Sequence, residues 1–367
     1  MAQQMKRKKT SKQWPQIYAK DSLDRFGDDL CELLLSYLTF EDRFRCECVS
    51  KQFRRKIFES VVDITFRDNC QHLCRIDCHF RSNPKKWIQE FGPLVTGISS
   101  FKASDKQSLT HCHRLSQLSV ESLADVFDTT SGQLLAMNLK AFDVEYNAIE
   151  NSVQLVSFFA GNQSLNTFAI YCNIRTEEWF HELTDQLSRL TQLRQLRLRL
   201  HLPNGENSLS ESLRTIGLNC KQLKRLALNL KSNHKVFNGQ TLDSLRCYRQ
   251  LKQLNLTLYD TIAGKVLKPL KLCHRLTHLR LNLRTINAKL FANCAEHWPR
   301  LHYLLIFTSD TTRECLSHLS RLPALKKLVL QSRETTQLSD NDFNDLLSRS
   351  PKLKSLTINR SIKCYSL

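Results

Sequence analysis

A six-residue pattern, Leu-x-x-Leu-x-Leu, recurs along the chain and constrains its fold more than any other feature. Seven clear copies follow one another at spacings of 24 to 30 residues, and in two of them Ile replaces the last Leu. They begin at Leu193, Leu223, Leu251, Leu276, Leu301, Leu325 and Leu353, and weaker copies begin at Leu115, Leu134 and Leu165. Self-similarity at such a period indicates an array of stacked structural units.

The alternation Leu-x-Leu is typical of a short strand with one apolar face. Helix-like stretches separate the strands, as in residues 210–223 and 339–353. One strand and one helix cannot bury these leucines alone, whereas stacked units bury them against their neighbours. We therefore predict an α/β fold over residues 61–367: a leucine-rich-repeat solenoid with parallel strands on the concave face and helices outside.

Cysteines recur just before the repeats. Cys112, Cys220 and Cys273 lie three residues before the first Leu of a repeat, and Cys247 lies four before. Because a free Cys behaves as a small apolar residue, we interpret these positions as packing sites. The repeats resemble the cysteine-containing and ribonuclease-inhibitor-like leucine-rich repeats. The Asn or Cys that those families carry after the third Leu is mostly missing here, so we expect irregular convex turns; other residues stand in its place at His201, Lys231, Tyr259 and Arg284.

Residues 26–53 differ from the repeats. Leu30, Leu34 and Leu38 recur at helical spacing, and the acidic pair Asp28 and Asp29 precedes them, which suits the start of an amphipathic helix. A segment of about 40 residues is too small for a substantial core of its own. We therefore expect it to depend on a partner or on the repeats.

This segment resembles an F-box, whose pattern is Leu-Pro-acidic-acidic-Leu, then Leu-Ser-Tyr-Leu, then Val-Ser/Cys-Lys/Arg-x-Trp-Arg. The matching stretches here are residues 26–30, 35–38 and 49–54, with Phe26 for Leu, Gly27 for Pro and Phe53 for Trp. The resemblance implies a small all-α module over residues 21–60, after a basic disordered tail over residues 1–20. The anchors that it implies for the adaptor are Phe26, Leu30, Leu34, Leu38, Val49 and Phe53.

F-box proteins with leucine-rich repeats are substrate receptors of SCF-type, cullin-based ubiquitin ligases. The resemblance implies that the F-box binds the Skp adaptor, and through it the cullin and the RING subunit, while the repeats bind a substrate protein destined for proteasomal degradation. The chain itself would perform no catalysis, and we expect no cofactor. A second interpretation of residues 26–58 is a cap that covers the apolar end of the repeat array, and one segment can serve both purposes.

The residues between the repeat leucines face outward from the strands and are the candidates for substrate binding. They include several cations and an apolar group on one strand, which together fit an acidic or phosphorylated peptide with an apolar anchor. The alternative is a solvated basic face beside one unusually apolar strand. The candidates are Arg197, Arg199, Arg225, His278, Arg280, Tyr303, Phe307 and Lys327.

The net charge of +19 lies mainly outside the N-terminal sixty residues and favours acidic partners. It supports a rival hypothesis, a basic repeat protein that binds nucleic acid, but the strands lack the serial aromatic residues that single-strand binders use. We therefore do not expect nucleic acid as the partner. A third hypothesis is a scaffold that binds the adaptor without serving a ligase.

Other signals are weaker. Cys70, Cys74 and Cys78 suit a zinc site or, equally, a buried helix face, and we predict no metal. The basic run at residues 6–9 fits a nuclear localisation signal or a solvated tail. No phosphate-binding, nucleophile-elbow or zinc-protease motif occurs, so we expect no enzyme. With no secretory signal and no apolar run of membrane-spanning length, we expect a cytoplasmic or nuclear protein without membrane contact.

Overall fold

The structure is a computed structural model of the 367-residue chain. The residues that it describes are 27–38, 42–43, 46, 48–60, 64–66, 93, 95–101, 106, 109–144, 152–173, 177–202, 207–232, 236–237, 242–259, 261–262, 266–309, 311–332 and 338–360.

Contacts divide the chain into two compact units. The first comprises Met1–Ile64 and Asp68–Glu90, and the second comprises Thr65–Arg67 and Phe91–Leu367. In the first unit the described helices are α1 (Asp28–Ser36) and α3 (Lys51–Ser60), which we call the helix pair. We call the second unit the solenoid. The division into tail, F-box and repeats at residues 20 and 60 stays a prediction.

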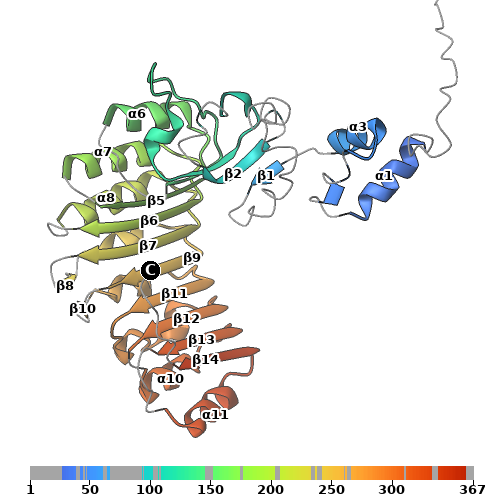
Figure 1. Ribbon diagram of the computed structural model, residues 1–367. Helices are drawn as coiled ribbons and strands as arrows, with labels where there is room; N and C mark the ends of the chain where they lie inside the picture. The colour runs from blue at the N-terminus through green and yellow to red at the C-terminus, as the bar shows by residue number, and fades with distance from the viewer. Residues whose placement is uncertain are drawn as a thin grey trace, which may run out of the picture. The chain divides into compact units, whose positions relative to one another are not determined.

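A twelve-stranded sheet forms the solenoid, and its strands follow the order β1-β2-β3-β4-β5-β6-β7-β9-β11-β12-β13-β14 (Figure 1). Every strand pair of this sheet whose register is defined is parallel. The predicted α/β repeat fold with parallel strands is therefore confirmed. The strands are β1 (Ile64–Phe66), β2 (Val95–Phe101), β3 (Gln117–Val120), β4 (Ala141–Val144), β5 (Thr167–Asn173), β6 (Gln195–Leu202), β7 (Arg225–Ser232), β9 (Gln253–Leu258), β11 (His278–Leu283), β12 (Tyr303–Thr308), β13 (Lys327–Ser332) and β14 (Ser355–Arg360).

The leucines of the repeat pattern form the core. In β11, Leu279, Leu281 and Leu283 are fully buried, while the side chains of His278 and Arg280 are exposed. The register aligns each leucine with its equivalent in the neighbouring strands, so the leucines form continuous columns. Burying one such side chain contributes about 1.5–3 kcal/mol, and the stacking of repeats makes this burial possible.

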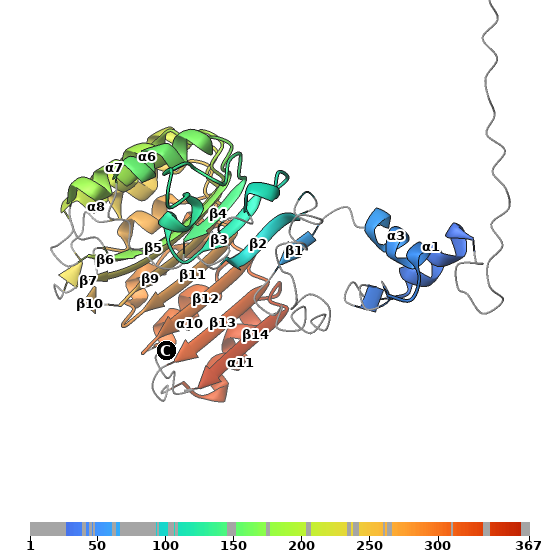
Figure 2. The same cartoon turned by 45° about the horizontal axis from the view of Figure 1, so that its top comes forward.

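Among the described connections, α-helices follow β4, β5 and β6 and again β12 and β13, whereas η5 (Leu123–Val126) connects β3 to β4. Helices α6 (Ser152–Gly161), α7 (Glu177–Ser188) and α8 (Asn207–Asn219) lie side by side along the sheet (Figure 2), and α10 (Arg313–Leu319) and α11 (Asp340–Arg349) follow near the C-terminus. The helices expected over residues 210–223 and 339–353 are present as α8 and α11.

Between α8 and α10, 3₁₀ turns replace the outer helices. They are η6 (Asp243–Cys247), η7 (Lys268–Leu272) and η8 (Ala288–Leu290), with the four-residue helix α9 (Cys294–His297) after η8. The expectation of helices along the whole outer side was therefore too uniform. Repeat length alone does not explain the difference, because the 24-residue repeat that begins at Leu301 contains α10 and the 28-residue repeat that begins at Leu223 contains η6. A separate pair, β8 (Val236–Phe237) and β10 (Thr261–Ile262), lies in the loops after β7 and β9.

Hydrogen bonds from buried side chains link neighbouring repeats. Trp298 is fully buried, and its Nε1 donates to the Leu270 carbonyl at 3.0 Å. Tyr248 Oη donates to the Leu213 carbonyl at 2.7 Å. Each bond joins residues about one repeat apart in the sequence, so these two repeats depend on their neighbours for polar satisfaction as well as for apolar burial.

The junction cysteines lie where a packing role requires them. Cys112, Cys220 and Cys273 are at most 8% exposed, and Cys247 is half-buried. Burial raises the pKa of Cys112 to about 11 and the pKa of Cys220 and Cys273 to about 12. The Cys220 thiol also donates to the Leu187 carbonyl at 3.3 Å. These thiols are therefore structural and weakly nucleophilic.

Of the three weaker copies, those at Leu115 and Leu165 mark β3 and β5 as predicted, whereas the copy at Leu134 is out of register. No strand begins within the copy at Leu134; the repeat begins instead at Leu139, and Phe142 and Val144 occupy the inward positions of β4. All three are at most 1% exposed. The prediction failed because Phe and Val take the places of Leu. The Phe142 ring packs against the Phe158 ring of α6, with their centroids 4.3 Å apart.

Candidate functional site

The helix pair presents one apolar stripe to solvent and buries another. On α1, Cys31 and Leu35 are at most 2% exposed. The other stripe consists of Leu30 (39% exposed), Leu33 (52%), Leu34 (42%) and Tyr37 (79%). The spacing i, i+3, i+4, i+7 places these four side chains on one side of the helix and its C-cap. We call them the exposed leucine stripe.

Helix α1 packs against α3 (Figure 1), and charged side chains link the two helices. The Asp28 carboxylate accepts from Gln52 Nε2 at 2.9 Å and from Arg55 at 2.6 Å. Lys56 Nζ lies 2.8 Å from Glu32 Oε1 and 3.2 Å from Asp28 Oδ2. The hydrogen bond from Gln52, followed by that from Lys56, lowers the pKa of Asp28 below its ordinary value. The acidic start of α1 therefore fixes the arrangement in which the leucine stripe faces outward.

The six predicted adaptor anchors have different positions. Leu30, Leu34 and Val49 are exposed and Leu38 is half-buried, whereas Phe53 is only 6% exposed and lies in the core of the pair. Phe26 lies outside the described residues. Leu33 and Tyr37, which are not among the predicted anchors, are also exposed on this side of the helix, and their helical spacing relative to Leu30 was the signal that could have identified them.

The second candidate surface is the side of the sheet on which the polar residues of each strand point outward. We call it the open strand face and define it by the alternate positions of β4 to β13 that register aligns. One row across neighbouring strands is Gln195, Arg225, Gln253, His278, Tyr303 and Lys327, and the next is Asp143, Ala169, Arg197, Ala227, Asn255, Arg280, Leu305 and Val329.

Tyr303 is the centre of a cluster on β11, β12 and β13. Its ring lies 5.7 Å from the His278 ring, with 29° between the ring planes. The Arg280 guanidinium lies 5.3 Å from the centre of the Tyr303 ring, and Lys327 Nζ lies 5.9 Å from it. An aromatic face attracts such cations. The Tyr303 ring therefore attracts one positive group from each neighbouring strand, Arg280 on β11 and Lys327 on β13. We call these four residues the Tyr303 cluster.

A second basic group lies on β6 and β7. Arg197 lies 3.7 Å from the carboxylate of Asp143, and Arg225 donates to Gln195 Oε1 at 3.2 Å. Arg199 lies 4.4 Å above the Tyr171 ring. All three arginines are exposed, and exposed pairs of this kind are worth only about 0–1 kcal/mol. The guanidinium groups therefore remain accessible to a stronger anionic partner.

The positive charge on the open strand face has little compensation. The strands from β5 to β14 in the main sheet contain no Asp or Glu. Partial burial lowers the pKa of His278 below its ordinary value. The neighbouring His302, Arg280 and Arg225 lower it further because their positive charges oppose protonation. A bound anion would reverse this effect and favour protonated His278.

The structure divides the eight predicted substrate-binding residues into two groups. His278, Arg280, Tyr303 and Lys327 meet in the Tyr303 cluster, whereas Arg197, Arg199 and Arg225 lie on β6 and β7. Strand β9, with uncharged Gln253, Asn255 and Thr257, separates them. Phe307 is half-buried at the other end of β12. The sequence did not reveal Tyr171, because its contact with Arg199 depends on the register of β5 and β6.

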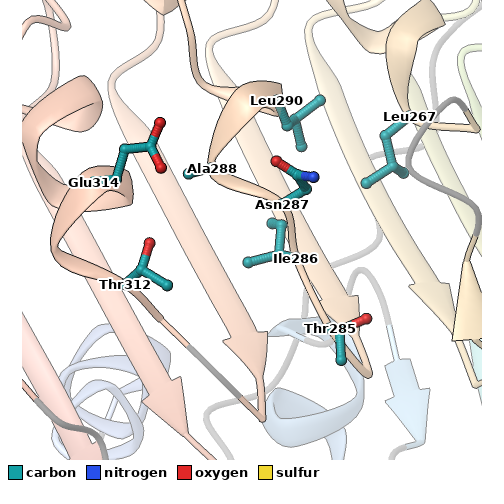
Figure 3. A pocket seen from close by; sticks show the side chains of 8 residues that line it. All are labelled: Leu267, Thr285, Ile286, Asn287, Ala288, Leu290, Thr312 and Glu314. Carbon is teal, nitrogen blue, oxygen red and sulfur yellow. The ribbon is translucent and has the colours of Figure 1, made fainter.

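A pocket of about 430 Å³ lies between three successive connections of the solenoid (Figure 3). Its polar groups already have structural partners. Asn287 Oδ1 accepts from the Lys289 N–H at 2.9 Å and caps η8, and Thr312 Oγ1 accepts from the Cys315 N–H at 3.3 Å and caps α10. We assign no ligand to it. The lining residues are Leu267, Thr285, Ile286, Asn287, Ala288, Leu290, Thr312 and Glu314.

The candidate metal site at Cys70, Cys74 and Cys78 and the basic run at residues 6–9 lie outside the described residues. Within the ranges that the structure describes, no group of three His, Cys, Asp or Glu side chains converges on a point where a metal ion would bind. In the same ranges, no helix has the length and apolar character needed to cross a bilayer.

Comparisons with known proteins concern overall structure. Models of protein families gave no match, and neither did curated protein sequences. Among solved structures, the chain is similar to TLR13 in its complex with ssRNA13, at 16% identity and a TM-score of 0.44, over 74% of this chain and 40% of that one. It is also similar to the leucine-rich-repeat-containing protein LegL7 from Legionella pneumophila, at 14% identity and a TM-score of 0.37, over 65% of this chain and 87% of that one. At these values the likeness carries no argument about ligands.

Proposed function

We propose that this protein is the substrate-recognition subunit of an SCF-type ubiquitin ligase, in which the helix pair binds the Skp adaptor and the open strand face binds the substrate. The observation that carries the proposal is the exposed leucine stripe on α1. Three of its four members are leucines on a helix that already has a buried face. Contiguous exposed apolar side chains usually mark an interaction site.

The resemblance of residues 26–54 to an F-box names the partner. The stripe contains Leu30 and Leu34 of the resembling motif, and Val49 is exposed nearby in sequence. Large apolar side chains at the centre of an interface carry most of its binding free energy. The Skp adaptor would therefore cover the stripe, while Phe53 and Leu35 would hold the helix pair together from inside.

Affinity purification of the full chain tests this assignment. Leu34→Asp places a charge in the proposed interface, and we expect loss of the Skp adaptor with retention of other partners. Leu347→Asp is the matched control, because Leu347 is 45% exposed on α11 and Leu34 is 42% exposed on α1. Equal recovery of the adaptor by both variants would contradict the assignment of the stripe.

For the substrate, the Tyr303 cluster supports an acidic or phosphorylated segment. Arg and Lys groups with no acidic residue on their strands favour a phosphate or a carboxylate, and the guanidinium fork matches the oxygen geometry of both. The half-buried Tyr303 and Phe307 offer an apolar anchor. A bound phosphate would favour protonated His278, so binding would strengthen as the pH falls through the lowered pKa of His278.

The receptor itself would be non-catalytic. It would act by holding substrate lysines close to the charged ubiquitin-conjugating enzyme, which raises their effective concentration. A scaffold that does not serve a ligase would also bind the adaptor, but it would not deliver a substrate for ubiquitination. Recovery of adaptor, cullin and a polyubiquitinated partner in one purification distinguishes the receptor from the scaffold.

The uncompensated charge of the open strand face also favours a second candidate function, binding of nucleic acid. Neutralised phosphates release counterions, so nucleic-acid binding weakens steeply as salt rises. Binding of the adaptor through an apolar stripe depends little on salt. Titration of a single-stranded RNA and of the adaptor at two salt concentrations separates the two functions.

A further inference from the structure

A groove of about 540 Å³ runs between α7 and α8 on the outer side of the solenoid. Its charged walls carry three carboxylates, in a chain whose net charge is +19. Glu182 and Asp185 lie one turn apart on α7, and Glu211 lies on α8. The remaining lining residues are His181, Thr184, Ser212 and Thr215. None of these side chains belongs to the helix pair or to the open strand face.

Ser212 is the feature that points to a ligand. It lines the groove and is 2% exposed, and among the described residues its hydroxyl has no hydrogen-bond partner. Its neighbour in the groove wall, Thr184, is also buried but donates to the Phe180 carbonyl at 2.8 Å. A buried hydroxyl without a partner costs about 1–3 kcal/mol, so a ligand that bonds to Ser212 recovers this loss.

The carboxylates retain capacity for a cation. Glu182 Oε1 accepts from Gln186 Nε2 at 2.8 Å, and Asp185 pairs with Arg189 at 2.8 Å, with both side chains 58% exposed. Such an exposed pair is weak, and Glu211 adds a further exposed carboxylate on the opposite wall. The groove is therefore a local acidic site on a basic molecule.

The spacing of these groups excludes a simple metal centre. No three of the described His, Cys, Asp and Glu side chains converge on a point where a metal ion would bind. Acceptors spread along two helices instead suit the several N–H donors of a guanidinium or an ammonium group, which can bond to a hydroxyl and to carboxylates together. His181, Asp185 and Glu211 are exposed, so the groove is open to a side chain that a larger partner presents.

We propose that the α7–α8 groove binds an arginine- or lysine-rich segment of a partner protein, with Ser212 and the three carboxylates as its acceptors. This site would be independent of the adaptor and of the anionic substrate. It has the opposite charge preference to the open strand face, so the two surfaces of the solenoid would select different partners.

Fluorescence anisotropy with labelled hexa-arginine tests the proposal. The groove variant combines Glu182→Gln, Asp185→Asn and Glu211→Gln. Its control combines Glu314→Gln, Asp340→Asn and Asp345→Asn, which removes the same charge from α10 and α11. The control is closely matched because Asp345 pairs with Arg349 at 2.9 Å just as Asp185 pairs with Arg189.

We expect the groove variant to bind hexa-arginine about tenfold more weakly than the control variant, since three weak ion pairs are lost. Ser212→Ala should weaken binding about fivefold with all charges retained. The peptide should also slow amide hydrogen exchange in α7 and α8. No binding to the wild type, or equal weakening by the groove and control variants, would overturn the proposal. Circular dichroism melting verifies that each variant is folded.

Discussion

On α1 of the helix pair, Leu30, Leu33 and Leu34 are 39–52% exposed, whereas the inward leucines of β7, β9 and β11 in the solenoid are at most 2% exposed. The difference follows from how each unit finds neighbours. A repeat in the solenoid receives a copy of itself on either side, so its leucines have a partner within the chain. The helix pair has one shared interior, and its outer apolar stripe has no repeated neighbour of this kind.

The largest effect that we expect is on the solenoid. Trp298→Ala removes a fully buried side chain and its hydrogen bond to the Leu270 carbonyl. We expect a loss of about 3–5 kcal/mol in the free energy of unfolding, measured by urea denaturation. Leu272→Ala, at a leucine that is 56% exposed in η7, should stay within about 0.5 kcal/mol of the wild type. Similar losses in both variants would mean that burial in the repeats does not determine their stability.

Adjacent leucines on α1 separate the two roles within the helix pair. Leu35 is 2% exposed and Leu34 is 42% exposed. Leu35→Ala should destabilise the pair by about 2 kcal/mol and accelerate hydrogen exchange in α3. Leu34→Ala should leave that exchange unchanged and weaken adaptor binding instead. If Leu34→Ala accelerates exchange as much as Leu35→Ala, the stripe is part of the core.

Acid should loosen the helix pair through Asp28. Hydrogen bonds from Gln52 and Lys56 lower the pKa of Asp28 from its ordinary value of 3.8 in the folded state. Because the pKa of Asp28 is lower in the folded state, its carboxylate stabilises that state at pH values above 3.8. This stabilisation is lost as the pH falls through the folded-state pKa of Asp28. NMR of the Gln52 side-chain amide should follow this titration below pH 3.8. The titration should be absent in Asp28→Asn and present in Asp29→Asn, and a shift that survives in Asp28→Asn would contradict the assignment.

The smallest effect is chemical and leaves stability unchanged. Cys48 is exposed in the first unit, whereas burial raises the pKa of Cys220 and Cys273 in the solenoid to about 12. At pH 8 these buried thiols are therefore almost entirely protonated and weakly nucleophilic. Alkylation followed by mass spectrometry should therefore label Cys48 first. Early labelling of Cys220 would show that the repeat junctions open readily.

The repeats could be predicted where leucine itself fills the pattern. From Leu193 onward each copy marks a strand, because the inward positions of the strand are the second and third leucines. The prediction lost its register at β4, where Phe142 and Val144 are buried in place of leucine. It also missed β2, whose sequence VTGISSF contains no leucine. Burial selects for apolar volume, and the leucine pattern is only its commonest form.

The candidate sites were predictable as surfaces but not as clusters. Alternation along each strand was enough to place Arg280 and Tyr303 on the open strand face. Their contact, and its extension to Lys327, required the register of three strands, which the spacing of repeats gives only approximately. On α1, helical spacing identified an apolar face, but only packing against α3 shows that the face divides into a buried part with Leu35 and an exposed part with Leu34.

Hydrogen exchange of the full chain, with and without the purified Skp adaptor, tests most directly whether the adaptor binds the exposed leucine stripe of α1. We expect the adaptor to slow amide exchange in α1 (Asp28–Ser36), whose exposed leucines it would cover, and to leave exchange in β7, β9 and β11 unchanged. Unchanged exchange in α1 at a saturating concentration of adaptor would contradict this expectation.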